Sequence, residues 1–305
     1  MTAKLRAVTC GFCSASVSWE PTMVRSDDYR KAFADATRKA TEPLVSLRGN
    51  AYAIGDRIGR GGACDVYDAA RIHRIGERII LKIVREPRDT DLIERERSIL
   101  TQLHERGAHP LVPVAVGIAK VSGGDHDGKP ALLLRFPPGF AYTLPAIQAA
   151  SGPVMDPRHA VWILRRTLSL LAVLHAQGVV HGAVLPDHIL VHPGNHGALL
   201  CAYVAAAKPG APIDLVDPAR EKFYPSLVAT PSLDIVMAAR SVCWLLGSPE
   251  PRTAPAQVPA PLATLLGELA EGRWGDARDA SQRVADAAKT VYGPPRFVRL
   301  DLGMD

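Results

Sequence analysis

The sequence has no apolar run of about 18 residues, the length that a membrane-spanning helix needs, so a membrane protein is not expected. Aromatic residues make up only 6% of its 305 residues, and no aromatic platform for stacking nucleic-acid bases is indicated. Its 25 glycines and 25 prolines are scattered, which excludes a fibrous repeat. Five cysteines, odd in number and widely spaced, do not make a disulfide framework. Reduced thiols and a cytoplasmic location are therefore expected.

The composition is that of an ordinary folded protein. Hydrophobic residues make up 47% and charged residues 22%, enough for a sizeable core. The length allows about two domains or one large bilobal fold. The net charge is +5, but lysine and arginine are interleaved with acidic residues along the chain. Such a pattern favours solubility over binding of nucleic acid or acidic lipid.

Residues 1–50 are expected to form an N-terminal extension. Cys10 and Cys13 have the spacing of half a zinc knuckle, but a closed tetrahedral site needs two further ligands. The remaining cysteines lie far away in the sequence: Cys64, Cys201 and Cys243. The pair is therefore either a degenerate knuckle or an accident. Residues 7–17 contain Thr, Ser and Cys and make a poor signal peptide. A short amphipathic helix is predicted over residues 27–40.

The hydrophobic periodicity of the rest of the chain changes from strand-like to helical near residue 140. Residues 51–139 predict strands, among them 78–84 and 131–136, around one helix over 91–103. Residues 140–288 predict a mainly helical part, and residues 289–305 a proline-rich tail. The helices expected in the second part cover residues 157–177, 232–246 and 262–270. The fold class is α+β.

A glycine-rich turn and a lysine are the first chemical signals. Gly59 and Gly61 lie between two predicted strands, where glycine lets backbone amides approach phosphates closely. The turn is neither a Walker loop nor a Rossmann turn, and alone a plain hairpin explains it. Lys82 stands in the apolar strand Ile-Leu-Lys-Ile-Val and is costly to bury without a partner. Glu96 on the following helix is the candidate partner, and Glu94 is its rival.

This arrangement resembles the small lobe of a protein kinase, and the resemblance implies a bilobal fold. In that family a glycine-rich loop covers the nucleotide phosphates, and a strand lysine pairs with a helix glutamate. Gly59, Gly61, Lys82 and Glu96 match these positions. Cys64 replaces the third glycine, and the interval from Lys82 to Glu96 is short. The resemblance thus implies a vestigial nucleotide site at the four matching residues.

The segment from His175 to Val191 resembles the kinase catalytic segment but lacks its chemistry. Ala183 stands where the family has the catalytic aspartate, and Leu185 where it has a lysine. His188 replaces the magnesium-binding asparagine, and Ala202 replaces the magnesium-binding aspartate. Alanine can neither orient the attacking hydroxyl nor hold a cation, so the family's phosphotransfer chemistry is not expected.

Neighbouring residues leave alternatives open. Asp187 is either a displaced acid or a solvated loop residue, and His181 is interpreted as a structural histidine that bonds backbone carbonyls. Asp234 resembles the family's aspartate that braces the catalytic loop. Arg278 resembles an arginine near the end of the domain, with Glu221 as its candidate partner.

The resemblance and the lost residues together predict a pseudokinase that acts as a protein-binding scaffold or regulator, with no cofactor and no metal. The alternative is an atypical ATP-dependent phosphotransferase or nucleotidyl transferase that uses displaced acidic residues. A protein partner is expected to bind through the large lobe or the terminal extensions, and no nucleic acid or membrane is expected. The Ala-, Arg- and Pro-rich composition is typical of high-GC bacteria and their phages.

Overall fold

The computed structural model describes residues 44–107, 110, 112–152 and 155–302, which form one compact unit. Cys10, Cys13 and the helix expected over residues 27–40 lie outside the described residues. Within the described ranges, no helix combines the length and the apolar character required to cross a lipid bilayer.

Six antiparallel strands close into a small barrel in the order β1-β2-β3-β4-β6-β5. They are β1 (Leu44–Leu47), β2 (Asn50–Arg60), β3 (Cys64–Arg71), β4 (Arg74–Val84), β5 (Val114–Ser122) and β6 (Pro130–Arg135). Side chains alternate along each strand, and Leu81 and Ile83 of β4 belong to the barrel core. β1 completes the closure by pairing with both β2 and β5. β1 lies close to β5 here, since a Cβ at Gly117 would lie 2.9 Å from Cδ2 of Leu47 and would displace the end of that side chain.

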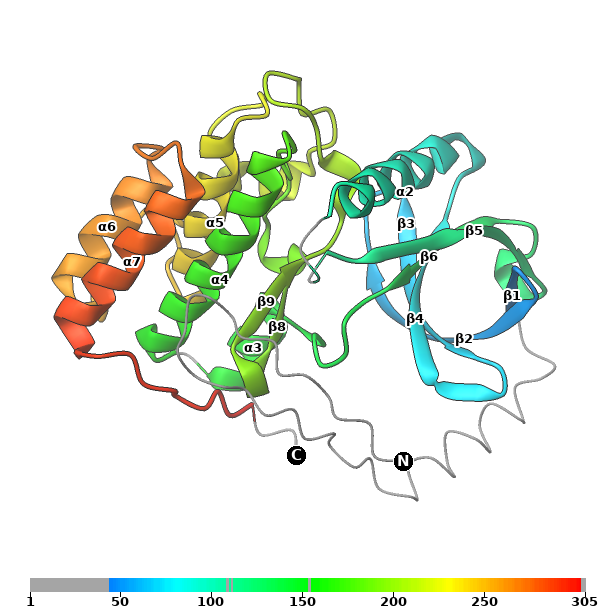
Figure 1. Cartoon of the computed structure of the whole chain (residues 1–305), viewed down its shortest axis with the longest axis horizontal. Coiled ribbons are helices and arrows are strands. Elements are labelled where there is room, and N and C mark those ends of the chain that lie inside the picture. The colour runs from blue at the N-terminus through cyan, green and yellow to red at the C-terminus, as the bar shows by residue number, and fades with distance from the viewer. Residues whose placement is uncertain (1–43, 108–109, 111, 153–154, 303–305) are drawn as a thin grey trace. The chain divides into compact units, whose positions relative to one another are not determined.

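One helix, α2 (Thr90–Glu105), lies alongside the barrel (Figure 1) and packs against β4, β5 and β6. Its buried face holds Ile93, Leu100 and Leu103 at the spacing of a single apolar stripe. Glu96 lies on the same face and is also buried. Because burying a carboxylate is costly, this helix needs a partner for Glu96 from a neighbouring element.

The second half of the chain is mainly helical. Its helices are α3 (Leu144–Ser151), α4 (Pro157–Ala176), α5 (Pro231–Leu245), α6 (Ala260–Ala270) and α7 (Ala277–Tyr292). α4 and α6 each pack against α5 and α7, and these four helices enclose much of the larger hydrophobic core (Figure 1). A capping side chain precedes each of these helices except α6. Asp156 accepts a hydrogen bond from the Arg158 amide, and Thr230 accepts one from the Leu233 amide.

A small sheet brings two loops together at one end. Its order is β7 (Tyr142–Thr143), β8 (Ile189–His192) and β9 (Gly197–Leu200), all antiparallel. Ile189 at the start of β8 pairs with Leu200 at the end of β9. Just beyond them, the Cys201 amide donates to the His188 carbonyl at 3.0 Å. The loop before β8 and the loop after β9 therefore lie side by side.

The tail after α7 returns to the helical part. Leu300 and Leu302 are buried in the larger core. The Phe297 ring stacks on His196 with centroids 4.0 Å apart, and His196 stacks on Trp162 at 4.3 Å. Residues 297–302 are thus held by both apolar and ring contacts.

The expected combination of strands and helices is confirmed. β4 and β6 form where strands are predicted, and α4, α5 and α6 begin and end within two residues of the predicted helices. β1 lies in the stretch predicted to be an extension, and the predicted boundary at residue 51 falls within β2.

Candidate functional site

The glycine-rich turn joins β2 to β3. Gly59 lies near the end of β2, and Gly61 lies in the turn, where its amide donates to the Cys64 carbonyl at 2.8 Å. Cys64 begins β3 and packs against the larger hydrophobic core. Burial raises the pKa of its thiol to about 11, because a thiolate would lose its hydration there. The thiol therefore stays protonated at neutral pH, and its side chain adds bulk where the resemblance implies a glycine.

Lys82 lies near the end of β4 and pairs with α2. Its Nζ is 2.5 Å from Oε2 of Glu96, whereas Glu94, the rival partner, is exposed. Burial by itself would lower the pKa of Lys82. The charge of Glu96 and its hydrogen bond outweigh that effect and raise the pKa. Lys82 is therefore charged at neutral pH, and its charge is compensated inside the protein.

The other carboxylate oxygen of Glu96 binds the segment after β9. Oε1 accepts a hydrogen bond from the Tyr203 amide at 3.0 Å. The Tyr203 ring is buried and meets the His181 ring edge-on at 4.7 Å. Ala202, just before it, has a left-handed backbone with φ 64° and carries only a methyl group where the resemblance implies a magnesium-binding aspartate. One chain of contacts thus joins β4, α2 and this segment.

Two histidines hold the backbone of Ala183. Nε2 of His181 donates to the Cys201 carbonyl at 3.1 Å, and Nδ1 accepts from the Ala183 amide at 3.3 Å. A carbonyl only accepts and an amide only donates, so this pattern requires a neutral imidazole. Burial accordingly lowers the pKa of His181 to about 4. The prediction of a structural histidine that bonds a backbone carbonyl is confirmed.

His188, where the resemblance implies a magnesium-binding asparagine, hydrogen-bonds to the same alanine. Its Nδ1 donates to the Ala183 carbonyl at 2.9 Å. Burial lowers the pKa of His188, so this ring is also neutral at neutral pH. Ala183 itself is only 4% exposed, and its methyl group cannot accept a proton where the resemblance implies the catalytic aspartate.

Asp234 of α5 is fully buried and accepts hydrogen bonds from the loop before β8. Its Oδ2 accepts from the His181 amide at 2.7 Å and from Nε2 of His175 at 2.8 Å, and its Oδ1 accepts from the Gly182 amide at 2.8 Å. Gly182 has φ 71°, and a Cβ there would lie 2.7 Å from the Ala205 carbonyl oxygen. These bonds are the loop-bracing contacts that the resemblance implies for this aspartate.

Asp187 forms an ion pair with Arg220, which the sequence did not predict. Arg220 lies in a 3-10 helix, Pro218–Phe223, of the segment that joins β9 to α5. Both side chains are partly exposed. Among the described residues, no cluster of three or more His, Cys, Asp or Glu side chains is arranged to hold a metal ion. The carboxylate nearest in sequence to His188 is therefore paired with an arginine.

The candidate pair of Arg278 with Glu221 is wrong. Both side chains are exposed, and no hydrogen bond or ion pair in the described part of the chain joins them. Arg240 makes the internal contact instead. It is buried in α5, and its guanidinium donates to the carbonyls of Ala270 and Lys222. An arginine inside the apolar run of α5 was the signal for this contact.

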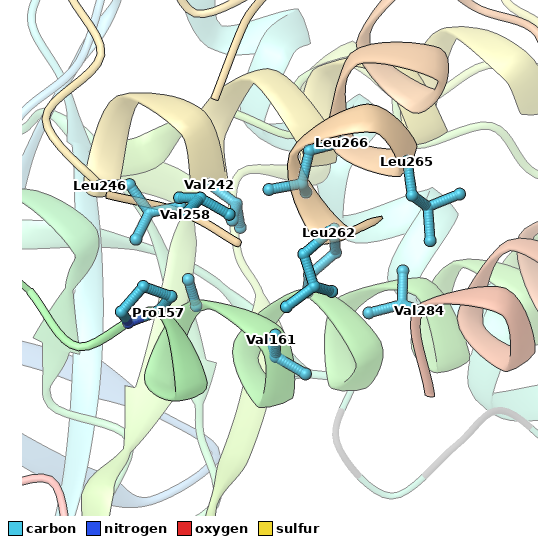
Figure 2. A pocket seen from close by; sticks show the side chains of 11 residues that line it. Pro157, Val161, Val242, Leu246, Val258, Leu262, Leu265, Leu266 and Val284 are labelled. Carbon is cyan, nitrogen blue, oxygen red and sulfur yellow. The ribbon is translucent and has the colours of Figure 1, made fainter. Parts of the chain in front are cut away.

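An apolar pocket lies among α4, α5, α6 and α7 (Figure 2). Its lining is Pro157, Ala160, Val161, Leu164, Val242, Leu246, Val258, Leu262, Leu265, Leu266 and Val284. These aliphatic side chains carry no group that can move a proton or hold a cation. The pocket shares no residue with the site described above and does not bear on phosphotransfer.

A family model described as the phosphotransferase enzyme family matches residues 65–178, less than half of the chain. The matched range includes Lys82 and Glu96. It ends before His181, so it does not reach Ala183 or the segment around Ala202.

Curated bacterial proteins are similar to this chain at low identity. The serine/threonine-protein kinase PknH of Mycobacterium tuberculosis (strain ATCC 25618 / H37Rv) is 28% identical over 162 residues, which cover 51% of this chain and 24% of that protein. The probable serine/threonine-protein kinase PknB of Bifidobacterium longum is 24% identical over 157 residues (50% and 22%). The serine/threonine-protein kinase Pkn1 of Myxococcus xanthus is 25% identical over 201 residues (62% and 27%). The aligned part spans about a quarter of these relatives.

Proposed function

We propose that this chain, which is protein-kinase-like, is a pseudokinase: a non-catalytic protein that acts as a scaffold or regulator by binding another protein. In this proposal residues 51–139, which hold α2 and all of the barrel except β1 and the first residue of β2, are the small lobe of a bilobal kinase-like domain. Residues 140–288 are the large lobe.

The observation that carries the proposal is the identity of three side chains at the degenerate site. Phosphotransfer needs a base that orients the attacking hydroxyl and metal ligands that hold the cations. Ala183 and Ala202 present methyl groups at two of these positions. His188 at the third position directs its Nδ1 to a backbone carbonyl, 2.9 Å away. These side chains supply neither the base nor the carboxylate ligand.

The ion pair of Asp187 with Arg220 argues against the alternative, an atypical phosphotransferase or nucleotidyl transferase that uses displaced acidic residues. Asp187 is the acid that such an enzyme would use, and it would first have to give up Arg220. One carboxylate, even when freed, would replace only one of the three missing groups.

The residues that resemble a nucleotide site have partners within the protein. Lys82 binds Glu96, Glu96 binds the Tyr203 amide, and the Gly61 amide is bonded within the turn. The same ion pair occurs in active kinases, so it is the missing groups at Ala202 and His188 that lead us to regard Gly59, Gly61, Lys82 and Glu96 as a vestigial nucleotide site. Binding of a partner protein is assigned to the large lobe or to the extensions 1–50 and 289–305, in the cytoplasm of a bacterium or a phage-infected cell.

The catalytic half of the proposal is tested with labelled ATP. We expect no incorporation into the protein itself or into generic substrates. Ala183→Asp alone should not restore transfer, because the metal ligands would still be missing. Robust transfer by the wild type that disappears in Lys82→Ala would overturn the proposal.

The scaffold half is tested by affinity capture from the native cell, mass spectrometry and reconstitution with the purified partner. We expect a stoichiometric complex whose affinity is the same with and without ATP and magnesium. Phosphorylation of the captured protein by this chain, or binding that requires ATP and magnesium, would contradict the proposal.

A further inference from the structure

Arg85, directly after β4, donates hydrogen bonds to the glycine-rich turn. Its backbone amide donates to the Ala63 carbonyl at 3.0 Å. One terminal nitrogen of its guanidinium donates to the Gly61 carbonyl at 2.8 Å and also to the Gly62 carbonyl. Three consecutive carbonyls of the turn therefore accept hydrogen bonds from one residue.

The guanidinium of Arg85 is itself anchored. Its other terminal nitrogen donates to Oδ1 of Asp65 at 3.1 Å, and Asp65 is 7% exposed. Arg60, on the other side of the turn, is farther from this carboxylate, with Nε 3.9 Å from Oδ1, and its side chain is mostly exposed. The Asp65 carboxylate compensates the charge of Arg85, so the guanidinium is held in place between the turn and β3.

These bonds fix the direction of the peptide groups in the turn. In a trans peptide the N–H points away from the C=O, so the amides of Gly62 and Ala63 point away from the guanidinium. The Gly61 amide is already bonded to the Cys64 carbonyl. Lys82 in β4 pairs with Glu96 of α2, whereas Arg85, just after β4, pairs with Asp65 of β3, so the two cations have separate partners.

We propose that Arg85 is a positioning residue that keeps the glycine-rich turn in one ordered conformation without a bound nucleotide. A turn with two glycines has high conformational entropy, and it needs contacts to become ordered. Arg85 supplies these contacts from inside the protein. This inference rests on the proposed function, because a protein that works without nucleotide needs another means of ordering this turn.

The test is NMR on the full-length protein without ligand, with hydrogen exchange of the Gly61 amide and ¹⁵N relaxation of Gly61–Cys64. In the wild type we expect the turn to be as ordered as β3. Arg85→Met should speed exchange of the Gly61 amide by roughly tenfold or more, since a hydrogen bond to a charged group is worth at least that factor. Exchange of core amides, such as those of Leu81 and Leu133, should not change.

Two further variants separate positioning from general stability. Arg85→Lys keeps the charge but lacks the planar fork, so it should recover only part of the order. Arg60→Met removes a nearby exposed arginine and should leave the turn unchanged. If Arg85→Met is poorly folded, the comparison of Arg85→Lys with the wild type carries the test.

The inference is overturned if Arg85→Met and Arg85→Lys leave the exchange and relaxation of the turn as in the wild type. It is also overturned if the wild-type turn is mobile and becomes ordered only when ATP and magnesium are added. The proposed function fails separately, through phosphotransfer or magnesium-dependent ATP binding by the wild type. A turn that is unaffected by Arg85→Met in a protein that binds no nucleotide would refute the inference alone.

Discussion

Lys82 and Glu96 form an ion pair with Nζ 2.5 Å from Oε2, and the second oxygen of Glu96 holds the Tyr203 amide. Glu96 is 2% exposed, so its charge is compensated almost entirely by protein groups. The pair joins β4 and α2, which are neighbours in the sequence, to the segment after β9, which lies far along the chain. The pair therefore has a structural role, whether or not a phosphate is bound.

Lys82→Met should therefore lower stability even when no ligand is present. The substitution leaves the Glu96 carboxylate buried and without its cation, which typically costs about 3–5 kcal/mol for a fully buried pair. Denaturant unfolding measures the difference. Glu94→Gln, a change at the exposed neighbour, should stay within about 0.5 kcal/mol of the wild type. Equal effects of the two substitutions would show that the pair does not hold α2.

Asp234→Ala should destabilise the loop before β8. It leaves the amides of His181 and Gly182 without an acceptor in a buried place, at about 1–3 kcal/mol each. The free energy of unfolding gives the total, and hydrogen exchange of the two amides locates the effect. Asp279→Ala, an exposed change on α7, is the control. If hydrogen exchange of the His181 and Gly182 amides were unchanged in Asp234→Ala, Asp234 would not stabilise this loop.

Stability should fall as the pH is lowered from about 6.5 to about 4, in part through His181. The pKa of His181 is lowered to about 4 in the folded state, so within this window the unfolded chain takes up a proton that the folded state does not. Its contribution is complete above pH 6.5 and is lost on acidification, with a total on the order of 3 kcal/mol.

The variant His181→Gln isolates this contribution from those of other acidic and histidine groups. The difference in unfolding free energy between wild type and variant should be largest near neutral pH and shrink toward pH 4. A difference that is constant from pH 7 to pH 4 would show that His181 titrates normally in the folded protein.

Arg220→Ala should not create a cation site. The change frees Asp187 from its ion pair, but a single carboxylate cannot replace the missing ligands at Ala202 and His188. Calorimetric titration with magnesium and ATP should give the same weak or absent binding as the wild type. Magnesium-dependent binding that appears in Arg220→Ala and is lost in Arg220→Ala/Asp187→Asn would favour the displaced-acid alternative.

The sequence predicted a contact where a charged residue interrupts a local apolar pattern. A lysine among Ile, Leu and Val needs a partner, and the next helix offered Glu96 on its apolar face. A charged group that stands where periodicity predicts burial needs a partner, because burial without one is costly. The brace at Asp234 came from the resemblance to the kinase family and not from such a pattern.

Other features depend on contacts that no local pattern encodes. β1 has only four residues, and its closure of the barrel depends on β5, far along the chain. Arg85 directly follows β4, and Arg220 lies in the segment between β9 and α5. Charged residues are common in such segments, so nothing in the sequence indicates their partners. The predicted pair of Arg278 with Glu221 was wrong for a related reason, because the sequence does not show whether an arginine is exposed or paired.

The central claim is that the nucleotide site is vestigial, and the most direct test is a thermal-shift or calorimetric titration of the wild type with ATP, with and without magnesium. The missing groups at Ala202 and His188 would hold the cations that neutralise the phosphates. We therefore predict weak or absent binding, and a stabilisation by ATP that is the same with and without magnesium. A large stabilisation that requires magnesium would contradict the account, because it would show that a cation site survives in this protein.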